Sequence, residues 1–219
     1  CYLMRRLIHL RRLKVKLIGF GVKKMNEAEK DSEWYRQKFL YPNGTLKNKL
    51  NITDAAELAQ KEYLGSGIRA VAFLRKNKKI TSVEDLKKIH KIMFGWLYDW
   101  AGQIRDYELV KGETEFLEYS RINFGIEEID EKIQQLSSKK ELANVDYAFL
   151  LDRLNYLHPF REGNGRSSKL FLQAFAANHG QVIDYPRSNK DLIIAQNNAD
   201  IDQIASLIRV NAKAKKVAH

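Results

Sequence analysis

The chain has 219 residues, with 38 Lys and Arg against 27 Asp and Glu, which gives a formal net charge of +11. Its 44% of apolar residues and its 3 Pro exclude wholesale disorder, collagen-like repeats and low-complexity tracts. The length fits one domain, or one domain with an appendage. Cys1 is the single cysteine, and no run of about 20 apolar residues is free of charge, so we predict a cytoplasmic protein without a transmembrane segment.

Much of the positive charge lies in residues 1–24, which hold eight Lys and Arg and no acidic residue. Without them the net charge falls from +11 to +3, so the rest of the chain requires no nucleic-acid partner. Two interpretations of this segment stay open. It is either a basic amphipathic arm for an anionic surface or a partner, or upstream sequence before a translation start at Met25. We predict a single domain over residues 25–219.

Past Met25 the spacing of the apolar residues is mostly helical. A Pro-Asn-Gly turn at residues 42–44 precedes a helix that we expect to begin near Thr53. Thr81 to Glu84 has the form of a capping box at the start of a further helix. In that helix the spacing predicts one long buried stripe, formed by Leu86, Ile89, Met93, Trp96 and Trp100.

The pattern changes between Ile104 and Tyr119, where short runs of β type surround Lys111-Gly112-Glu113-Thr114 and predict a β-hairpin. Helical spacing then returns, and the last of the long helices ends at Gly180, a residue suited to a left-handed cap. The predicted fold class is all-α with one small β-hairpin. The further helices are expected at about 126–136, 146–157, 166–179, 190–197 and 202–210.

Two of these helices flank the segment His158-Pro159-Phe160-Arg161-Glu162-Gly163-Asn164-Gly165-Arg166. Pro159 ends the first helix just after His158 and leaves that imidazole at a helix end. Gly163 and Gly165 allow backbone N–H groups to approach a ligand closely. The N-terminus of the second helix follows, and its unpaired N–H donors are suited to phosphate.

Four side chains add specific chemistry to this segment. Arg166 and Lys169 lie three residues apart on one helical face and supply positive charge for phosphates. Glu162 offers a hard oxygen ligand for Mg²⁺ between phosphate oxygens, and His158 can accept a proton from a hydroxyl. Each residue alone has a plainer interpretation, such as a capping histidine, a simple turn or a solvated charge. Their occurrence together, in this order, favours a phosphate-binding site.

The sequence at residues 158–169 closely resembles the signature of the Fic family, His-x-Phe-x-Asp/Glu-Gly-Asn-Gly-Arg-x-x-Arg. Members of this family mostly transfer AMP from ATP to a protein hydroxyl. The resemblance covers roughly residues 34–208 and includes the run from Tyr98 to Arg105. It implies a Mg²⁺-dependent protein adenylyltransferase with ATP as co-substrate.

The resemblance also implies a role for each matching residue. His158 would be the general base, Phe160 the core anchor of the loop and Glu162 the Mg²⁺ ligand. Arg166 would neutralise the leaving pyrophosphate, and Lys169 stands where the family has its final Arg. Lys169 keeps the charge but loses bidentate geometry toward a phosphate or a carboxylate. The anion hole would consist of Gly163, Asn164 and Gly165.

The hairpin, at about residues 104–119, corresponds in the family to a flap on which the target backbone docks by strand addition. The docking segment would run from Lys111 to Phe116, with Lys111 and Gly112 beside the nucleotide. The resemblance to bacterial toxins implies topoisomerase subunits as targets, whereas the resemblance to injected effectors implies host GTPases.

Many Fic proteins are inhibited by a helix with the motif Ser/Thr-x-x-x-Glu-Gly/Asn. The three partial matches in this sequence begin at Thr53, Thr114 and Ser137, and none is followed by the required Gly or Asn. We therefore predict that a separate small antitoxin supplies this helix, as in bacterial toxin–antitoxin pairs.

Two alternative functions stay open. Lys169 can mark a decayed site, in which case the chain is a non-catalytic Fic-like binding protein and residues 1–24 bind nucleic acid or membrane. The same fold can also transfer another group, such as UMP, phosphate or phosphocholine. The Trp-rich stretch 96–100 is interpreted as core rather than as an adenine pocket, and a secreted effector is the alternative to a cytoplasmic protein.

Overall fold

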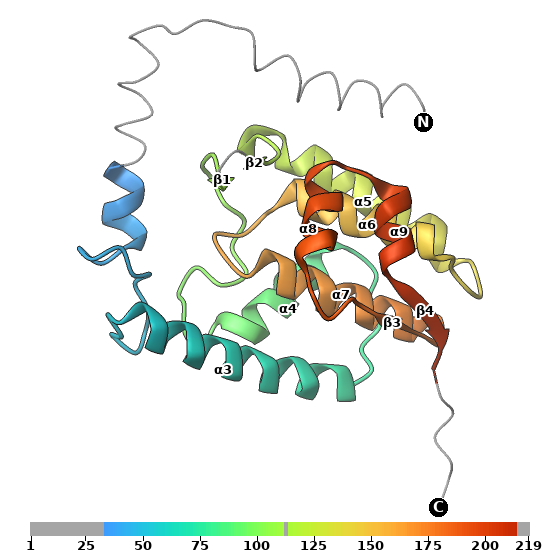
Figure 1. Ribbon diagram of the computed structural model, residues 1–219, viewed down its shortest axis with the longest axis horizontal. Helices are drawn as coiled ribbons and strands as arrows, with labels where there is room; N and C mark the ends of the chain where they lie inside the picture. The colour runs from blue at the N-terminus through green and yellow to red at the C-terminus, as the bar shows by residue number, and fades with distance from the viewer. Residues whose placement is uncertain (1–32, 112–113, 214–219) are drawn as a thin grey trace, which may run out of the picture. The chain divides into compact units, whose positions relative to one another are not determined.

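The computed structural model describes residues 33–111 and 114–213 (Figure 1). The predicted basic arm, residues 1–24, and Met25 lie outside the described residues. The chain divides into two units at Lys47–Asn48, and each is described by itself. In the first unit residues 33–39 are helical, and Leu40 forms an antiparallel bridge with Leu46. The predicted turn lies between them, with Gly44 at a φ of 86°.

The second unit is mainly helical, which confirms the predicted fold class. None of the helices in the described part of the chain is long and apolar enough to cross a membrane. The helices are α3 (Ala55–Arg75), α4 (Val83–Phe94), α5 (Ile122–Ser137), α6 (Asn144–Leu157), α7 (Asn164–Asn178), α8 (Lys190–Asn197) and α9 (Ile201–Leu207), with a 3₁₀ turn at Tyr119–Arg121.

The core of this unit is built around α6 and α7. The helix α6 packs against α5, α7 and α9, and α7 packs against α4 as well (Figure 1). Large side chains of both helices are fully buried, among them Tyr147, Phe171 and Phe175. The connection between α6 and α7 is therefore held at both ends by the most buried helices of the fold.

Two short antiparallel sheets accompany the helices. The predicted hairpin is confirmed as β1 (Val110–Lys111) paired with β2 (Thr114–Glu115). The second sheet pairs β3 (Gln181–Asp184) with β4 (Arg209–Ala212), and it was not predicted. The expected helix at 202–210 was wrong in its last turn, because Ile208 is already extended and starts the path into β4. The residues of β3 do not alternate between apolar and polar, so they give no period-2 signal.

The start of α4 differs from the predicted capping box. Ser82 is the N-cap and its side chain makes no capping hydrogen bond. Thr81 instead donates from its backbone N and its Oγ1 to Oδ2 of Asp85, at 2.9 and 3.1 Å. The helix boundary was correct, but an Asp one turn into the helix supplies the acceptor.

The predicted stripe of α4 is buried through Met93 and was wrong beyond it. The helix ends at Phe94, because the chain turns at Gly95, where a Cβ would lie 2.6 Å from the carbonyl oxygen of Lys91. Trp96 and Trp100 are consequently only half-buried, whereas Leu97 and Tyr98 between them are buried.

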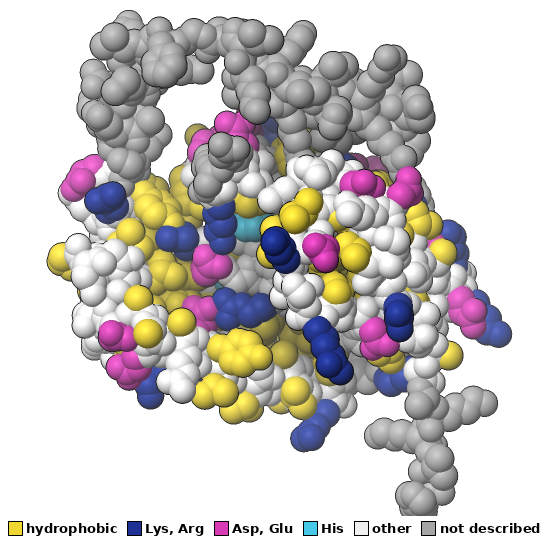
Figure 2. All heavy atoms as spheres, in the orientation of Figure 1, with side chains coloured by type: hydrophobic (Ala, Val, Ile, Leu, Met, Phe, Trp, Pro, Cys, Tyr) yellow, Lys and Arg dark blue, Asp and Glu magenta, His cyan; other side chains and the backbone are white. Residues whose placement is uncertain are grey.

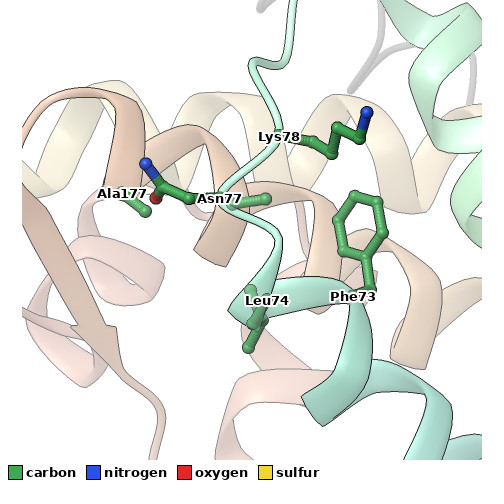
Figure 3. A pocket seen from close by; sticks show the side chains of 6 residues that line it. Phe73, Leu74, Asn77, Lys78 and Ala177 are labelled. Atoms are coloured by element: carbon green, nitrogen blue, oxygen red, sulfur yellow. The ribbon is translucent and has the colours of Figure 1, made fainter.

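A small cavity lies between the end of α3 and α7 (Figure 3). Its volume of about 10 Å³ suffices for roughly one water molecule. None of the residues that line it belongs to the segment 158–169, so this cavity is separate from the predicted site. The lining residues are Phe73, Leu74, Asn77, Lys78, Ala174 and Ala177.

Candidate active site

His158 caps the C-terminus of α6 with a left-handed backbone, at a φ of 39° and a ψ of 60°. The helix ends there because Pro159 follows, as the sequence predicted. The His158 side chain is buried, and its ring stacks on Phe116 of the flap with 3.6 Å between the ring centroids. The end of α6 and the flap together fix the plane of the imidazole.

The hydrogen bonds of His158 define its protonation state. Nδ1 lies 3.1 Å from the carbonyl oxygen of Asn155, and since a carbonyl only accepts, Nδ1 carries the proton. Nε2 is buried and has no hydrogen-bond partner among the described residues. Burial, assisted by the charge of Lys111, lowers the pKa of His158 to about 3. At neutral pH the imidazole is therefore uncharged, with a free lone pair on Nε2.

The signature loop, residues 158–169, is closed by its own side chains. The Asn164 amide accepts a hydrogen bond from the backbone N of Phe160 at 2.9 Å and donates to its carbonyl oxygen at 2.7 Å. The Phe160 side chain is fully buried, as expected of a core anchor. Gly163 adopts a φ of 77°, and a Cβ there would lie 2.6 Å from the ring of Phe94. The loop is therefore closely packed.

The N-terminus of α7 forms the inner edge of this loop. The first helical hydrogen bond runs from the N of Ser167 to the carbonyl oxygen of Gly163, at 3.0 Å. The N–H groups of Asn164, Gly165 and Arg166 thus precede the first bonded turn and have no acceptor within the helix. A Cβ at Gly165 would meet nothing within 4 Å, so there is open space beside this first turn of the helix.

The predicted anion hole accordingly has a backbone basis. Gly163, Asn164 and Gly165 contribute conformation and N–H groups, while the Asn164 side chain is already occupied by Phe160. The ligand contacts themselves stay a prediction.

Glu162 of the signature loop is ion-paired with Lys111 of the flap, at 3.1 Å between Oε2 and Nζ. The backbone N of Gly163 also donates to Glu162 Oε1, at 3.0 Å. Burial disfavours the charged carboxylate, but Lys111 and this N–H outweigh it and lower the pKa of Glu162. The structure thus brings together the predicted metal ligand and the predicted nucleotide-binding lysine. Gly112 lies outside the described residues.

Arg166 and Lys169 were predicted to face the same ligand, but they have different partners. The Nη2 of Arg166 donates to Oε1 of Glu62, and its guanidinium lies 4.9 Å from the centre of the Phe94 ring. Lys169 donates to Oδ1 of Asn189 at 2.5 Å and lies 5.2 Å from the centre of the Tyr185 ring. Near the middle of the face in Figure 2, basic and acidic side chains gather around a small area of histidine surface.

Sequence reasoning missed Arg105, a buried residue that joins the flap to the signature loop. Its Nε donates to the carbonyl oxygen of His158 at 2.9 Å, and its Nη1 to that of Tyr107 at 2.7 Å. Its Nη2 donates to the carbonyl oxygen of Leu117. The cation satisfies the end of α6, where carbonyls lack helical donors. No local pattern marks this role, because the acceptors at His158 and Leu117 are backbone atoms 53 and 12 residues away.

His90 of α4 was also missed. Gly102 donates its backbone N–H to Nδ1 of His90 at 2.9 Å, so Nε2 carries the proton and donates to the carbonyl oxygen of Glu162 at 2.8 Å. Burial lowers the pKa of His90 to about 4. The ring stacks on Phe160 with 3.8 Å between the centroids. A single His next to an apolar stripe was the only signal in the sequence.

The side chains available as metal ligands fit magnesium better than a metal whose ligands all come from the protein. Among the described residues no three His, Cys, Asp or Glu side chains gather as a metal cluster. Magnesium is commonly held by one or two carboxylates together with substrate phosphates and water. An ionised Glu162 beside an open helix N-terminus fits that pattern.

Residues 80–176 match the model of the Fic/DOC family. The matched range contains His90, the flap, the signature loop and most of α7. These matched residues form a Fic/DOC domain.

Two curated relatives are similar over most of this chain. A protein named "Protein adenylyltransferase VbhT", of Bartonella schoenbuchensis, is 32% identical over 180 residues, which are 77% of this chain and 37% of that protein. A protein named "Probable protein adenylyltransferase Fic", of Escherichia coli, is 28% identical over 71% of this chain and 80% of its own length. The chain thus spans little more than a third of the Bartonella relative and most of the E. coli relative.

The fold matches a solved structure of BepC, a VirB-translocated effector protein of Bartonella tribocorum, with bound AMPPNP. The TM-score is 0.67 at 21% identity, and the match covers 80% of this chain and 98% of the other. At this identity the likeness shows the fold.

The depressed pKa of His158 predicts that acid destabilises the fold. In the unfolded chain the imidazole takes up a proton below pH 6.5, whereas in the folded chain it does so only near pH 3, so stability falls as the pH drops through this window. His158 alone should lower the free energy of unfolding by about 1.4 kcal/mol per pH unit. Urea denaturation of wild type and His158→Asn between pH 7 and pH 4 measures this difference. Parallel curves for the two proteins would contradict it.

Proposed function

We propose that this chain is a protein adenylyltransferase that transfers AMP from ATP to a Ser, Thr or Tyr hydroxyl of a target protein. The observation that carries the proposal is the neutral Nε2 of His158, which has no partner in the described part of the chain, beside the N-terminus of α7. A base for a hydroxyl and donors for phosphate are the two elements that this reaction requires. The names of the two curated relatives, and the AMPPNP bound to BepC, support the same reaction.

In the proposed reaction the target hydroxyl oxygen attacks the α-phosphorus of ATP. A new bond forms between this oxygen and phosphorus, the bond between the α-phosphorus and the bridging oxygen breaks, and pyrophosphate leaves. Nε2 of His158 takes the proton of the hydroxyl. The resulting positive charge on the ring is stabilised by the hydrogen bond from Nδ1–H to the Asn155 carbonyl oxygen. Arg105 keeps the His158 backbone in place through its bond to the carbonyl oxygen.

The phosphates would be bound by the N-terminus of α7 and by Arg166. The N–H groups that precede Ser167 face the phosphate oxygens, and the helix dipole favours negative charge there. Glu162 would hold Mg²⁺, which neutralises phosphate charge when bound. Lys111, now paired with Glu162, is free to turn to a phosphate oxygen once the carboxylate has another cation. Lys169 remains a candidate for the terminal phosphate.

The target would dock on the flap by strand addition. The hairpin of β1 and β2 has only two paired residues on each side, so each strand keeps backbone groups for a further strand. Phe116 follows β2 and stacks on His158, which couples the docked segment to the base. A target backbone added at residues 111–116 would bring its hydroxyl near Nε2.

We further propose that a separate small protein restrains the enzyme by supplying a Ser/Thr-x-x-x-Glu-Gly helix, as in a toxin–antitoxin pair. The sequence contains no complete copy of that motif. The place of action would be the cytoplasm, either of the producing cell with topoisomerase subunits as targets, or of a host cell reached by secretion.

Incubation of the chain with α-labelled ATP, Mg²⁺ and a bacterial lysate tests the proposal. We expect label on at least one protein of the lysate. Excess unlabelled ATP should suppress the label, whereas excess unlabelled UTP should leave it. The absence of labelled protein, from a preparation that binds ATP, would instead indicate a non-catalytic binding protein. Label from α-labelled UTP, in a parallel reaction that gives none from α-labelled ATP, would indicate UMP transfer.

Gly165→Ala is expected to weaken ATP binding by about 10-fold, a loss of about 1.4 kcal/mol, without lowering thermal stability. A Cβ at this position tilts toward the N-terminus of α7, into the open space in front of the phosphate donors. Alanine is otherwise favoured over glycine in a helix. Calorimetric titration with ATP and thermal melting measure the two effects.

Gly67→Ala is the matched control, because Gly67 also lies in a helix and a Cβ added there would meet nothing within 4 Å. It should share the unchanged or raised melting temperature and bind ATP as the wild type does. Equal ATP binding by Gly165→Ala and Gly67→Ala would exclude phosphates from the N-terminus of α7.

A further inference from the structure

Glu62 of α3 is a buried carboxylate to which sequence reasoning assigned no role. It is 8% exposed, and both of its oxygens have partners. Oε1 accepts a hydrogen bond from Nη2 of Arg166, and Oε2 accepts one from the hydroxyl of Tyr98. Glu62 thus connects α3, and the turn that follows α4, to the first turn of α7.

We propose that Glu62 is a positioning residue, which orients Arg166 toward the polyphosphate tail of the nucleotide. This inference rests on the proposed function, since it takes Arg166 as a phosphate contact. Its physical basis is the cost of ordering a long side chain, which a preformed hydrogen bond removes before the ligand arrives. The Arg166 side chain is 36% exposed, so packing alone does not immobilise it.

Tyr98 in turn fixes Glu62. The Tyr98 side chain is 1% exposed and stacks on Trp100 with 4.5 Å between the ring centroids. Burial, together with Glu62, raises the pKa of the Tyr98 hydroxyl, which therefore keeps its proton and remains a donor. With one oxygen anchored in this way, the second oxygen of Glu62 has a defined direction toward Arg166.

The arrangement leaves Arg166 able to bind an anion. Its guanidinium has a protein acceptor only at Nη2 within the described part of the chain, and the ring of Phe94 lies 4.9 Å from its central carbon. The remaining N–H groups are available to phosphate oxygens. Glu62 therefore lies behind the guanidinium as a support and uses one of its donors.

The opposite role for Glu62 is inhibition, because a carboxylate bound to Arg166 competes with phosphate for the same guanidinium. The two roles predict opposite results for Glu62→Ala. If Glu62 supports Arg166, its truncation weakens nucleotide binding. If Glu62 competes with phosphate, its truncation strengthens nucleotide binding. The buried anchor at Tyr98 favours the support, because it resists the movement that release of Arg166 would require.

The test measures binding of ATP and of adenosine by calorimetry, with Mg²⁺ present, for five variants. We expect Glu62→Ala to weaken ATP binding by about 10-fold and to leave adenosine binding unchanged. Glu62→Gln should retain most of the ATP affinity, because its amide oxygen still accepts from Arg166. Glu62→Ala combined with Arg166→Ala should bind ATP no more weakly than Arg166→Ala alone. Glu57→Ala, an exposed Glu of the same helix, is the control and should match the wild type.

Tighter ATP binding by Glu62→Ala would overturn the inference, because it would show that Glu62 competes with phosphate for Arg166. Equal losses for ATP and adenosine, or additive losses in the double variant, would reduce Glu62 to a structural residue and overturn it too. If Glu62→Ala fails to fold, Glu62→Gln and Tyr98→Phe decide, since the first should retain ATP affinity and the second should lose part of it. Adenylyl transfer by the wild type is measured separately, so a protein that binds ATP through Glu62 and Arg166 without transferring AMP would refute only the proposed function.

Discussion

His158→Ala is expected to lower the rate of AMP transfer by about 10²- to 10⁴-fold while ATP binding stays within a few-fold of the wild type. The reason is the arrangement at Nε2, which is buried, uncharged and without a partner among the described residues. A base that serves only the hydroxyl proton contributes to the transition state and little to nucleotide affinity. Single-turnover transfer and calorimetric ATP binding separate the two quantities.

The backbone of His158 is left-handed, so His158→Asn should accompany the alanine variant, because Asn tolerates this conformation better. His179→Ala, at the other end of α7, is the matched control and should transfer AMP at the wild-type rate. Transfer by both His158 variants at more than about a tenth of the wild-type rate would remove His158 from the role of general base.

Arg105→Met is expected to lower the free energy of unfolding by about 3–5 kcal/mol. The substitution removes the donors to the carbonyl oxygens of His158, Tyr107 and Leu117; the bonds to His158 and Leu117 are buried, and the bond to Tyr107 is partly buried. Each buried carbonyl that loses its donor costs about 1–3 kcal/mol. The remaining folded protein should also transfer AMP slowly, since the His158 backbone and the flap lose their common support.

Urea denaturation measures this loss, with Arg105→Lys as the informative second variant. A lysine keeps the charge but cannot reach three carbonyls in different directions, so it should recover only a minor part of the stability. Arg209→Met, an exposed Arg on β4, is the control and should stay within about 0.5 kcal/mol of the wild type. A loss below about 1 kcal/mol in Arg105→Met would mean that water or other groups satisfy these carbonyls.

The site could be predicted from the sequence where its residues are close together in the chain. Pro159 sets the end of α6, the glycines permit the loop, and α7 follows directly, so the local order of His158, Glu162 and Arg166 is enough to predict a base and a phosphate end. The hairpin was also predicted, because its turn and strands are local. The start of α4 was predicted correctly although Asp85 supplies the acceptor, whereas the end of α9 was misplaced because Ile208 is already extended.

The rest of the site depends on contacts between distant segments, for which one sequence contains no signal. Glu62 and Arg166 are 104 residues apart, and Arg105 reaches the end of α6 across 53 residues. The ion pair of Lys111 with Glu162 likewise joins residues 51 positions apart. Periodicity reports which face of a helix is buried, but not which polar group lies opposite it.

Parallel reactions with α-labelled and γ-labelled ATP test the central claim most directly. Both contain Mg²⁺ and bacterial lysate, with His158→Ala as the blank. An adenylyltransferase forms its new bond at the α-phosphorus and releases pyrophosphate. We therefore predict labelled protein from α-labelled ATP, labelled pyrophosphate from γ-labelled ATP, and neither product with His158→Ala. Labelled protein from γ-labelled ATP, or equal labelling by wild type and His158→Ala, would contradict the assignment of AMP transfer to this site.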